Sequence, residues 1–422
     1  MSGIVQNNIL RSSGTVAVSA AGLNWSDTII TGSTATVEAG NGYWINTTSN
    51  TCTITLPSSA EKGDQIVLID YARTWGTNKI IIDSNGLNYQ GNDDTYTVEY
   101  ETDGQSVNIV YSDATKGWIP LEDDVTAFDH GDPPTQKAIF GFGDTGSGVI
   151  STSNLVNSSG VMGTDVTGVG TARKQLAAAG YGGDKAIFGY GDAGGNSSLT
   201  NKVSNSGVVA SDTTGVGTAR RALAAASYGV DKSIFGYGYV AGNVSMTNLV
   251  SNSGVVASDV TGVGTARHDL AATGYGTPAN GTAIFAYGYV AGSVSLSNLC
   301  NNVGVIASDV TGVGTARQTL AAARYGGDKA LFAFGSGSVT TRNLVSSSGV
   351  IATDASGAGT GRFYISAAMY GGDKAIFAFG STGSDFLSMT NLVSNTGVVA
   401  SDTTGTGTGR IQTAGSGYSY SA

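Results

Sequence analysis

Lys185-Ala-Ile-Phe-Gly-Tyr-Gly191 is the stretch that decides the fold, because close copies of it recur along the chain. The six copies begin at Lys137, Lys185, Lys232, Thr282, Lys329 and Lys374, and their central residues are Phe140, Phe188, Phe235, Phe285, Phe332 and Phe377. Subtraction of successive numbers gives spacings of 48, 47, 50, 47 and 45 residues. A period near 48 residues in six copies indicates a repeat architecture.

One repeat reads as four short antiparallel strands. An Ala-rich segment, 222–229, precedes the turn that leads into 233–239, and the segments 247–254 and 255–259 follow. Gly pairs and the Asn-Ser-Gly triplet mark the turns between them. Four strands in such a length match one blade of a β-propeller, with the Ala-rich strand innermost, where strands crowd together. The sequence therefore predicts a six-bladed propeller of four-stranded blades.

The first and last repeats predict how the propeller closes. The first repeat begins at Lys137 without an Ala-rich strand, and the segment from Arg410 to Tyr418 resembles that strand without a partner. We expect this C-terminal strand to complete the first blade and remove two exposed sheet edges. An open solenoid is the alternative, and it requires a polar cap at each end.

The repeat resembles a degenerate kelch repeat over residues 137–422. The likeness rests on Arg-x-x-Leu-Ala-Ala-Ala, on Gly-Gly-Asp-Lys-Ala-Ile-Phe-Gly-Tyr-Gly, and on a segment with Val and Asp that leads to the next Arg. The late Trp of the kelch pattern is missing, and its Gly-Gly doublet is reduced to Gly-x-Gly. The resemblance implies a propeller.

The first third of the chain differs from the repeats, and it contains all four tryptophans, Trp25, Trp44, Trp75 and Trp118. Alternating segments place Cys52, Ile54 and Leu56 on one face of a strand, and Val107, Ile109 and Tyr111 on one face of another. We expect an N-terminal arm at 1–34, a β-sandwich-like module at 35–124, a linker at 125–136 with Pro133 and Pro134, and the propeller at 137–422.

The module also resembles a known group. The order Asn-Gly-Tyr, Thr-x-Thr-Leu-Pro, Gly-Asp, Asp-Tyr, Thr-Asn and Tyr-x-Asp-Ala-Thr-Lys-Gly-Trp, over about 38–122, is similar to β-modules of tailed-phage virion proteins, notably fibres of phages that infect cyanobacteria. The resemblance implies a virion structural protein of the fibre, spike or decoration type, often a homotrimer, that contacts other virion proteins.

Composition excludes several classes of partner and location. The net charge of −10 and the pI near 4.6 argue against a nucleic-acid partner, which needs clustered Lys and Arg. No secretory signal and no apolar run long enough to span a membrane are expected. Cys52 and Cys300 are expected to be buried thiols. These features predict assembly in a cytoplasm, and the resemblance to phage modules implies the virion as the final location.

The residue inventory gives no catalytic, cofactor or metal site. The two histidines, His130 and His268, are too few for a copper site of the kelch-oxidase type, and no Cys/His cluster suits zinc. The sialidase box, the Gly-x-Ser-x-Gly elbow and the P-loop are missing. We therefore expect a protein that is not an enzyme and has no cofactor.

An Asp and an Arg eight residues apart recur in every copy. We interpret them as structural pairs, in which Asp caps a turn and Arg meets a carboxylate between blades; a ring of polar groups that binds a ligand is the alternative. The pairs are Asp165/Arg173, Asp212/Arg220, Asp259/Arg267, Asp309/Arg317, Asp354/Arg362 and Asp402/Arg410.

The loops that differ between copies are the candidate binding residues, since loops on a rigid scaffold commonly carry recognition. Tyr239, Asn243 and Tyr289 lie in the loop after the Lys-Ala-Ile-Phe strand, and Asn280 lies in an insertion at 277–281. The two tyrosines are expected either to stack on a sugar or to pack against a neighbouring blade.

The two resemblances, together with a composition rich in Gly, Ser, Thr and Asn, imply a non-enzymatic structural protein of a tailed-phage virion. The N-terminal region would attach to the particle, and the propeller would bind a glycan or protein of the host surface. A capsid decoration protein is one alternative. A glycan-cleaving enzyme with two close carboxylates is another.

Overall fold

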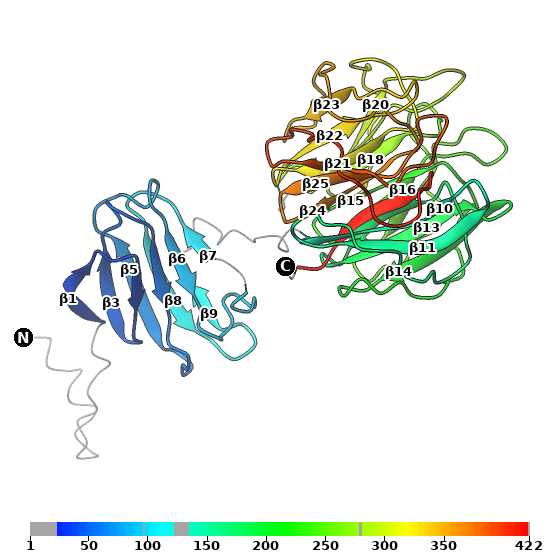
Figure 1. Ribbon diagram of the computed structural model, residues 1–422. Helices are drawn as coiled ribbons and strands as arrows, with labels where there is room; N and C mark the ends of the chain where they lie inside the picture. Colours follow the sequence, from blue (N-terminus) through cyan, green and yellow to red (C-terminus); the bar gives the residue numbers. More distant parts are fainter. Residues whose placement is uncertain (1–22, 96–97, 122–134, 278–280, 421–422) are drawn as a thin grey trace, which may run out of the picture. The chain divides into compact units, whose positions relative to one another are not determined.

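The computed structural model describes residues 23–95, 98–121, 135–277 and 281–420, and the chain is an all-β protein. It divides into two compact units, Met1–His130 and Gly131–Ala422, which are shown in Figure 1. Within the described ranges there is no helix with the length and apolar character needed to cross a membrane.

The N-terminal unit contains two sheets. The first has the order β1-β3-β5-β8-β9, and the second has the order β2-β4-β6-β7. The bounds are β1 Asn24–Ile30, β2 Thr34–Thr36, β3 Asn41–Ile45, β4 Cys52–Thr55, β5 Gln65–Asp70, β6 Ile80–Asp83, β7 Val98–Tyr100, β8 Ser106–Tyr111 and β9 Trp118–Pro120.

The chain alternates between these two sheets from β1 to β6, so neighbouring strands in each sheet run parallel. Strands β7, β8 and β9 then add antiparallel pairs. One apolar core lies between the sheets, and the two faces predicted from Cys52 to Leu56 and from Val107 to Tyr111 are part of it. Trp75 and Trp118 are fully buried in the same core.

Strand β1 corrects the predicted start of the module at residue 35. It pairs with β3 from Asn24 to Ile30, inside the segment that was expected to be an arm. Its side chains are mostly exposed or half-buried, and Trp25 stacks on Trp44 with ring centroids 4.8 Å apart. An edge strand without a buried face lacks the alternation that identifies a strand in a sequence.

In its described residues, the repeat unit contains six three-stranded sheets. Their orders are β11-β10-β27, β12-β13-β14, β15-β16-β17, β18-β19-β20, β21-β22-β23 and β24-β25-β26. The bounds are β10 Lys137–Asp144, β11 Val149–Val156, β12 Ala177–Tyr181, β13 Lys185–Asp192, β14 Asn196–Val203, β15 Ala224–Tyr228, β16 Lys232–Gly236, β17 Thr247–Val250, β18 Ala271–Tyr275, β19 Thr282–Ala286, β20 Ser297–Cys300, β21 Ala321–Tyr325, β22 Lys329–Ala333, β23 Arg342–Val345, β24 Ser366–Tyr370, β25 Lys374–Ala378, β26 Thr390–Val393 and β27 Ala414–Tyr418.

Each sheet places its Lys-Ala-Ile-Phe strand in the middle and its Ala-rich strand on one side. The middle strand is buried on both faces, as Ala186, Ile187 and Phe188 show with no exposed surface. Six separate apolar clusters lie between adjoining sheets, and one of them joins Phe140 of the first repeat to Ile376 of the last. Burial of the repeated Phe therefore holds neighbouring sheets together.

The predicted fourth strand is not a continuous strand. In the third sheet, the segment 255–260 makes only isolated bridges to β17, at Val250–Val256 and at Thr247–Val260. Between these bridges the Asn248 side chain donates to Ala257 O at 3.0 Å and to Asp259 Oδ1 at 2.9 Å. The Asn248 amide thus binds Ala257 O, a backbone acceptor that a regular ladder would pair with a backbone N–H.

The C-terminal strand occupies the predicted place. β27 pairs antiparallel with β10, with Lys137 opposite Tyr418 and Gly141 opposite Ala414 (Figure 1, red strand). The Ala-rich strands contact one another in the cyclic order β12, β15, β18, β21, β24, β27 and back to β12. The first sheet is therefore built from both ends of the repeat unit.

Candidate functional site

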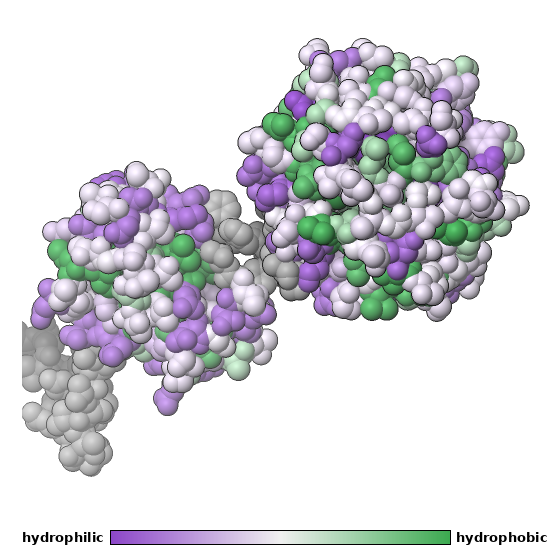
Figure 2. All heavy atoms as spheres, viewed as in Figure 1, coloured by the Kyte–Doolittle hydropathy of each residue, from purple (hydrophilic) through white to green (hydrophobic). Residues whose placement is uncertain are grey.

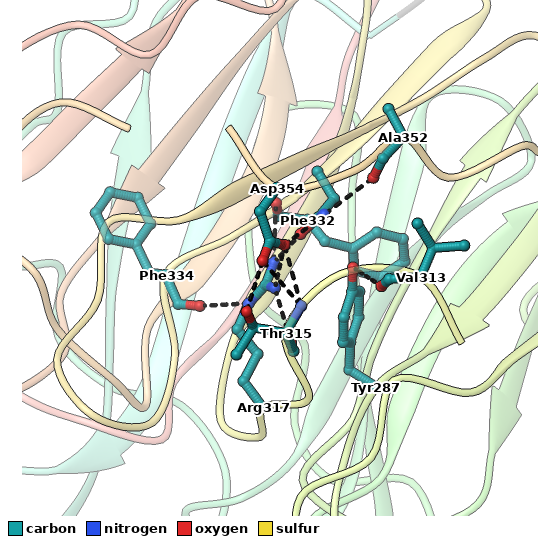
Figure 3. A network of polar contacts seen from close by, with 9 residues as sticks. Tyr287, Val313, Thr315, Arg317, Phe332, Phe334, Ala352 and Asp354 are labelled. Carbon is teal, nitrogen blue, oxygen red and sulfur yellow. Dashed lines mark hydrogen bonds and ion pairs between the residues drawn. The ribbon is translucent and has the colours of Figure 1, made fainter. Parts of the chain in front are cut away.

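A buried arginine at the start of each sheet is the most regular polar feature of the repeat unit. Figure 3 shows Arg317, whose Nε donates to Phe334 O at 2.9 Å and whose Nη2 donates to Asn343 Oδ1 at 2.6 Å. The guanidinium lies over the ring of Tyr287 from the preceding sheet, 4.4 Å from its centroid. Hydrogen bonds within one sheet and a cation–π contact to its neighbour therefore meet at one side chain.

The partner carboxylate of each arginine is not the Asp eight residues before it in the sequence. Arg317 Nη1 lies 3.9 Å from Asp354 Oδ1, whereas Asp309 lies against Arg267. The pairs are Arg173–Asp212, Arg220–Asp259, Arg267–Asp309, Arg317–Asp354, Arg362–Asp402 and Arg410–Asp165. The Asp and Arg at the two ends of one connector do not pair with each other, because the connector leads from one sheet to the next. The Arg instead meets the Asp that ends its own sheet, and not a carboxylate of a neighbouring sheet.

The aspartate also binds the connector that precedes the arginine. Asp354 accepts hydrogen bonds from Thr315 N at 2.9 Å and from Thr315 Oγ1 at 2.6 Å, and not from its own turn. Burial alone would raise the pKa of Asp354, but bonds from Thr315 and Asn343 and the charge of Arg317 hold the pKa below its usual range. Gly314 is required here, since its φ is +75° and a Cβ would lie 2.3 Å from Asp354 Oδ1.

The repeated arginines have almost no exposed surface, so they form a framework and present no accessible group to a ligand. Four of the six form the Nη2–Asn bond that Arg317 forms: Arg173, Arg317, Arg362 and Arg410. Arg267 Nη2 instead donates to Phe285 O, at 3.3 Å. Burial lowers the pKa of Arg173 to about 10, with Asp212 opposing the shift.

The residue that follows each framework arginine differs in every sheet. It pairs with the residue that ends the middle-strand segment, which also varies. The six pairs are Lys174–Asp192, Arg221–Tyr239, His268–Tyr289, Gln318–Ser336, Phe363–Ser381 and Ile411–Asp144. A regular framework thus carries a set of variable positions at one end of the six sheets.

Two of these pairs and one loop residue come together as a polar strip, which consists of Arg221, Tyr239, Asn243, His268 and Tyr289. The His268 ring lies between the two tyrosine rings, with a centroid distance of 5.3 Å to each. The Arg221 guanidinium lies 5.1 Å from the centroid of the Tyr239 ring. All five residues are half-buried, so part of each side chain reaches solvent.

Hydrogen bonds fix the orientation of the histidine. Asn243 Nδ2 donates to Val290 O at 3.0 Å, so Asn243 Oδ1 is the acceptor that faces His268 Nδ1 at 2.7 Å. His268 Nδ1 therefore carries a hydrogen, and Nε2 presents a lone pair in the neutral ring. Burial, and then the charge of Arg221, lower the pKa of His268, which favours that neutral ring.

Asp269 lies beside the strip. Its Oδ2 is 3.8 Å from His268 Nε2. Burial raises the pKa of Asp269 to about 6, and the charge of Arg221 opposes this shift. Burial raises the pKa of Tyr364, and the negative charge of Asp269 raises it further. Tyr364 therefore lies close to the same carboxyl.

Asp269 belongs to a cycle of six backbone hydrogen bonds. Each of six residues donates its N–H to the C=O of the equivalent residue in the preceding sheet, at 2.9 to 3.2 Å. The six are Gln175, Ala222, Asp269, Thr319, Tyr364 and Gln412, and all have φ between 51° and 56°. Five non-glycine side chains larger than Ala are thus held in the left-handed region by bonds to their neighbours.

The structure brings together three of the four predicted binding residues. Tyr239, Asn243 and Tyr289 all belong to the polar strip. Asn280 lies outside the described residues. The residues that flank its loop, Tyr275 and Thr282, lie at the opposite end of the β18–β19 hairpin from His268 and Tyr289.

Arg221, His268 and Asp269 were not among the binding residues predicted from the sequence. His268 was considered only as a metal ligand, and Arg221 and Asp269 lie beside conserved-looking motif residues of the repeat. An alignment of the six copies at the two positions after the framework arginine shows the signal, because the first position differs in all six copies and the second repeats only as Gln175 and Gln412. Among the residues described, no group of three or more His, Cys, Asp and Glu is placed to hold a metal ion.

Comparisons with known proteins add no relative. No family model matches the chain, and no curated protein matches it.

Proposed function

We propose that the repeat unit is a closed six-bladed β-propeller. The pairing of β10 with β27, the cyclic contacts of the Ala-rich strands and the cycle of six backbone hydrogen bonds support this architecture. The framework pair Arg410–Asp165 adds to this support, because its members lie at opposite ends of the repeat sequence.

For the whole chain we propose a non-enzymatic structural role in a tailed-phage virion, with the propeller displayed for adhesion to a host-surface glycan. The N-terminal module supports the virion role through its resemblance to fibre and decoration modules. The polar strip carries the adhesion proposal, since it is a half-exposed group of aromatic and polar side chains on a framework that is otherwise regular.

The chemistry of the strip suits the hydroxyl groups of a sugar. His268 Nε2 and Asp269 Oδ2 are two acceptors only 3.8 Å apart, and a donor placed between them would satisfy both. Tyr239 and Tyr289 supply apolar ring surface beside these acceptors. On the face of the repeat unit in Figure 2, most residues have intermediate hydropathy, and hydrophobic and hydrophilic areas are small and scattered. A glycan with many hydroxyls fits this surface better than a strongly charged or apolar partner.

The test combines particle analysis with binding. Mass spectrometry of purified particles should detect the chain, and the full-length protein should bind polysaccharide isolated from host envelopes. The double variant Tyr239→Ala/Tyr289→Ala should bind at least tenfold more weakly. Ser336→Ala/Ser381→Ala is the matched control, because these serines occupy the equivalent positions in two other sheets. Equal binding by both double variants and the wild type would overturn the adhesion site.

A glycan-cleaving activity is the second candidate, and one observation favours it. The pKa of Asp269 near 6 is the value expected of a carboxylic acid that donates a proton at neutral pH. Release of reducing sugar from the same polysaccharide, lost in Asp269→Asn, would establish cleavage in place of adhesion.

A further inference from the structure

A cavity of about 420 Å³ lies between the six Ala-rich strands of the repeat unit. The second and fourth residues of each strand line it, and most of them are Ala, Gly or Ser. The volume falls within the range of roughly 300–1,000 Å³ that is typical of small-molecule sites. None of the residues in the cycle of backbone hydrogen bonds lines this cavity, so it is separate from the polar strip and from Asp269.

Arg324 breaks the regularity of the wall. At the fourth position of the strand the other five repeats have Gly180, Ser227, Gly274, Met369 and Gly417, so only Arg324 brings a charge there. Its Nε donates to Gly327 O at 2.7 Å, and its Nη2 donates to Gly276 O at 2.5 Å. Within the described part of the chain, Nη1 makes no hydrogen bond, so the side chain is held in place with one donor group unused.

The charge of Arg324 is not neutralised by an ion pair with a described residue, although Asp328 also lines the cavity. No carboxylate of a described residue lies within ion-pair distance of it, and burial lowers its pKa, with the charge of Asp328 opposing. Asp328 already forms an ion pair with Lys329 at 2.9 Å. Equivalent pairs of adjacent residues recur in three other repeats, as Asp184–Lys185, Asp231–Lys232 and Asp373–Lys374. These acids and lysines neutralise each other, which leaves a net positive charge at Arg324.

Arg324 is half-buried, so its guanidinium is only partly hydrated, and a bound anion would offset the lost hydration. Because Nε and Nη2 are already used, a carboxylate would accept a charge-assisted hydrogen bond from Nη1 alone. The alanine wall and Met369, which lines the cavity on the next strand, offer apolar contacts to the carbon skeleton of such a ligand. We propose that this cavity binds a small organic carboxylate of about monosaccharide size through Nη1 of Arg324.

This inference rests on Arg324 and the cavity, and it does not depend on the adhesion proposed for the polar strip. The carboxylate can belong to a free small acid or to an acidic sugar at the end of a glycan, and both present the same group. Calorimetric titration of the full-length protein with glucuronate and with an oligosaccharide that ends in glucuronate distinguishes these sources. Glucose is the neutral probe that matches glucuronate in shape.

The wild type should bind glucuronate and not glucose, and binding should weaken tenfold or more in Arg324→Met. Met is the natural residue at this position in the next repeat. Arg324→Lys keeps the charge and should retain part of the affinity for glucuronate. This variant tests the role of the charge even if Arg324→Met does not fold. Tyr239→Ala/Tyr289→Ala should bind glucuronate as the wild type does.

A second measurement is the thermal unfolding midpoint. Glucuronate should raise the midpoint of the wild type and leave that of Arg324→Met unchanged. If the wild type binds neither acidic probe, or if Arg324→Met and the wild type bind glucuronate equally, the proposed site is wrong. Loss of glucuronate binding in the tyrosine variant would also contradict it, since that result would place the ligand on the strip.

Discussion

Arg410 Nη2 donates a hydrogen bond to Asn154 Oδ1 at 2.6 Å, although 256 residues separate the two in the sequence. The equivalent bond in the fifth sheet, between Arg317 and Asn343, spans only 26 residues and has the same length. The same Arg–Asn bond thus joins the two ends of the repeat unit in the first sheet and neighbouring segments in the fifth sheet.

A designed disulfide tests this meeting of the two ends. Asp144 and Ile411 form an antiparallel bridge with hydrogen bonds of 3.0 Å in both directions, and such a pair lies close enough for a disulfide. We expect Asp144→Cys/Ile411→Cys to form an intramolecular bond on mild oxidation, seen by mass spectrometry of the digested protein. Asp144→Cys/Gln318→Cys is the control and should stay reduced. If the first pair also stays reduced, the two ends do not meet.

The framework arginine should dominate the stability of its sheet. Arg317→Met leaves the buried Phe334 O and Asn343 Oδ1 without the donors of Arg317 and removes the positive charge beside Asp354, and we expect the free energy of unfolding in urea to fall by about 3–5 kcal/mol. Arg221→Met is the matched control, since the Arg221 side chain is half-exposed, and it should cost no more than about 1 kcal/mol. Similar losses in both variants would argue against the framework role.

Asp269 should make stability depend on pH. Its pKa is about 6 in the folded protein and close to 4 when unfolded, so the folded state binds more protons between pH 4 and 6. The free energy of unfolding should therefore fall as pH rises through this window. Asp269→Asn, which stays neutral, should be more stable than the wild type at pH 7 by up to about 3 kcal/mol, with little difference near pH 4.

Arg221, His268 and Tyr364 face this carboxyl and affect the same measurement. The comparison should therefore be repeated in the His268→Gln background, where protonation of the histidine no longer contributes. A constant difference between Asp269→Asn and its parent across pH 4 to 7 would show that the carboxyl does not titrate in this window.

The two thiols should be unreactive in the folded protein. Cys52 and Cys300 are free and buried, and burial raises the pKa of Cys300 to about 12 and also raises the pKa of Cys52. We expect no reaction with a colorimetric disulfide reagent at pH 8 and the release of two equivalents after unfolding. Fast reaction in native buffer would contradict the burial of one of them.

The sequence predicted the elements whose residues are buried in a regular pattern. The six Lys-Ala-Ile-Phe strands and the faces of Cys52–Leu56 and Val107–Tyr111 were identified because burial imposes apolar side chains at those positions. The C-terminal strand was placed correctly because its residues match an element missing from the first repeat. Strand β1 was missed because neither of its faces is buried.

The polar network was harder to predict, because its ion pairs depend on which sheets each connector joins. The Asp and Arg residues were recognised, but their partners were wrong, because Arg317 reaches an aspartate at the far edge of its own sheet. The candidate site was predicted in part. Tyr239, Asn243 and Tyr289 were identified from variation between copies. The contacts of His268 with both tyrosines and with Asp269 join residues of different sheets, so they were visible only in the structure.

The pairing of β10 with β27 means that the covalent order of the six sheets is only one of several that give the same contacts. Lys137 lies opposite Tyr418, so a short linker could join these two ends and a new terminus could be opened at another connector. A circular permutant that starts at Gln318 would keep every sheet, every apolar cluster and the whole backbone cycle. The positions that vary between copies, and with them any recognition surface, would keep their places although the gene encoded them in a different order.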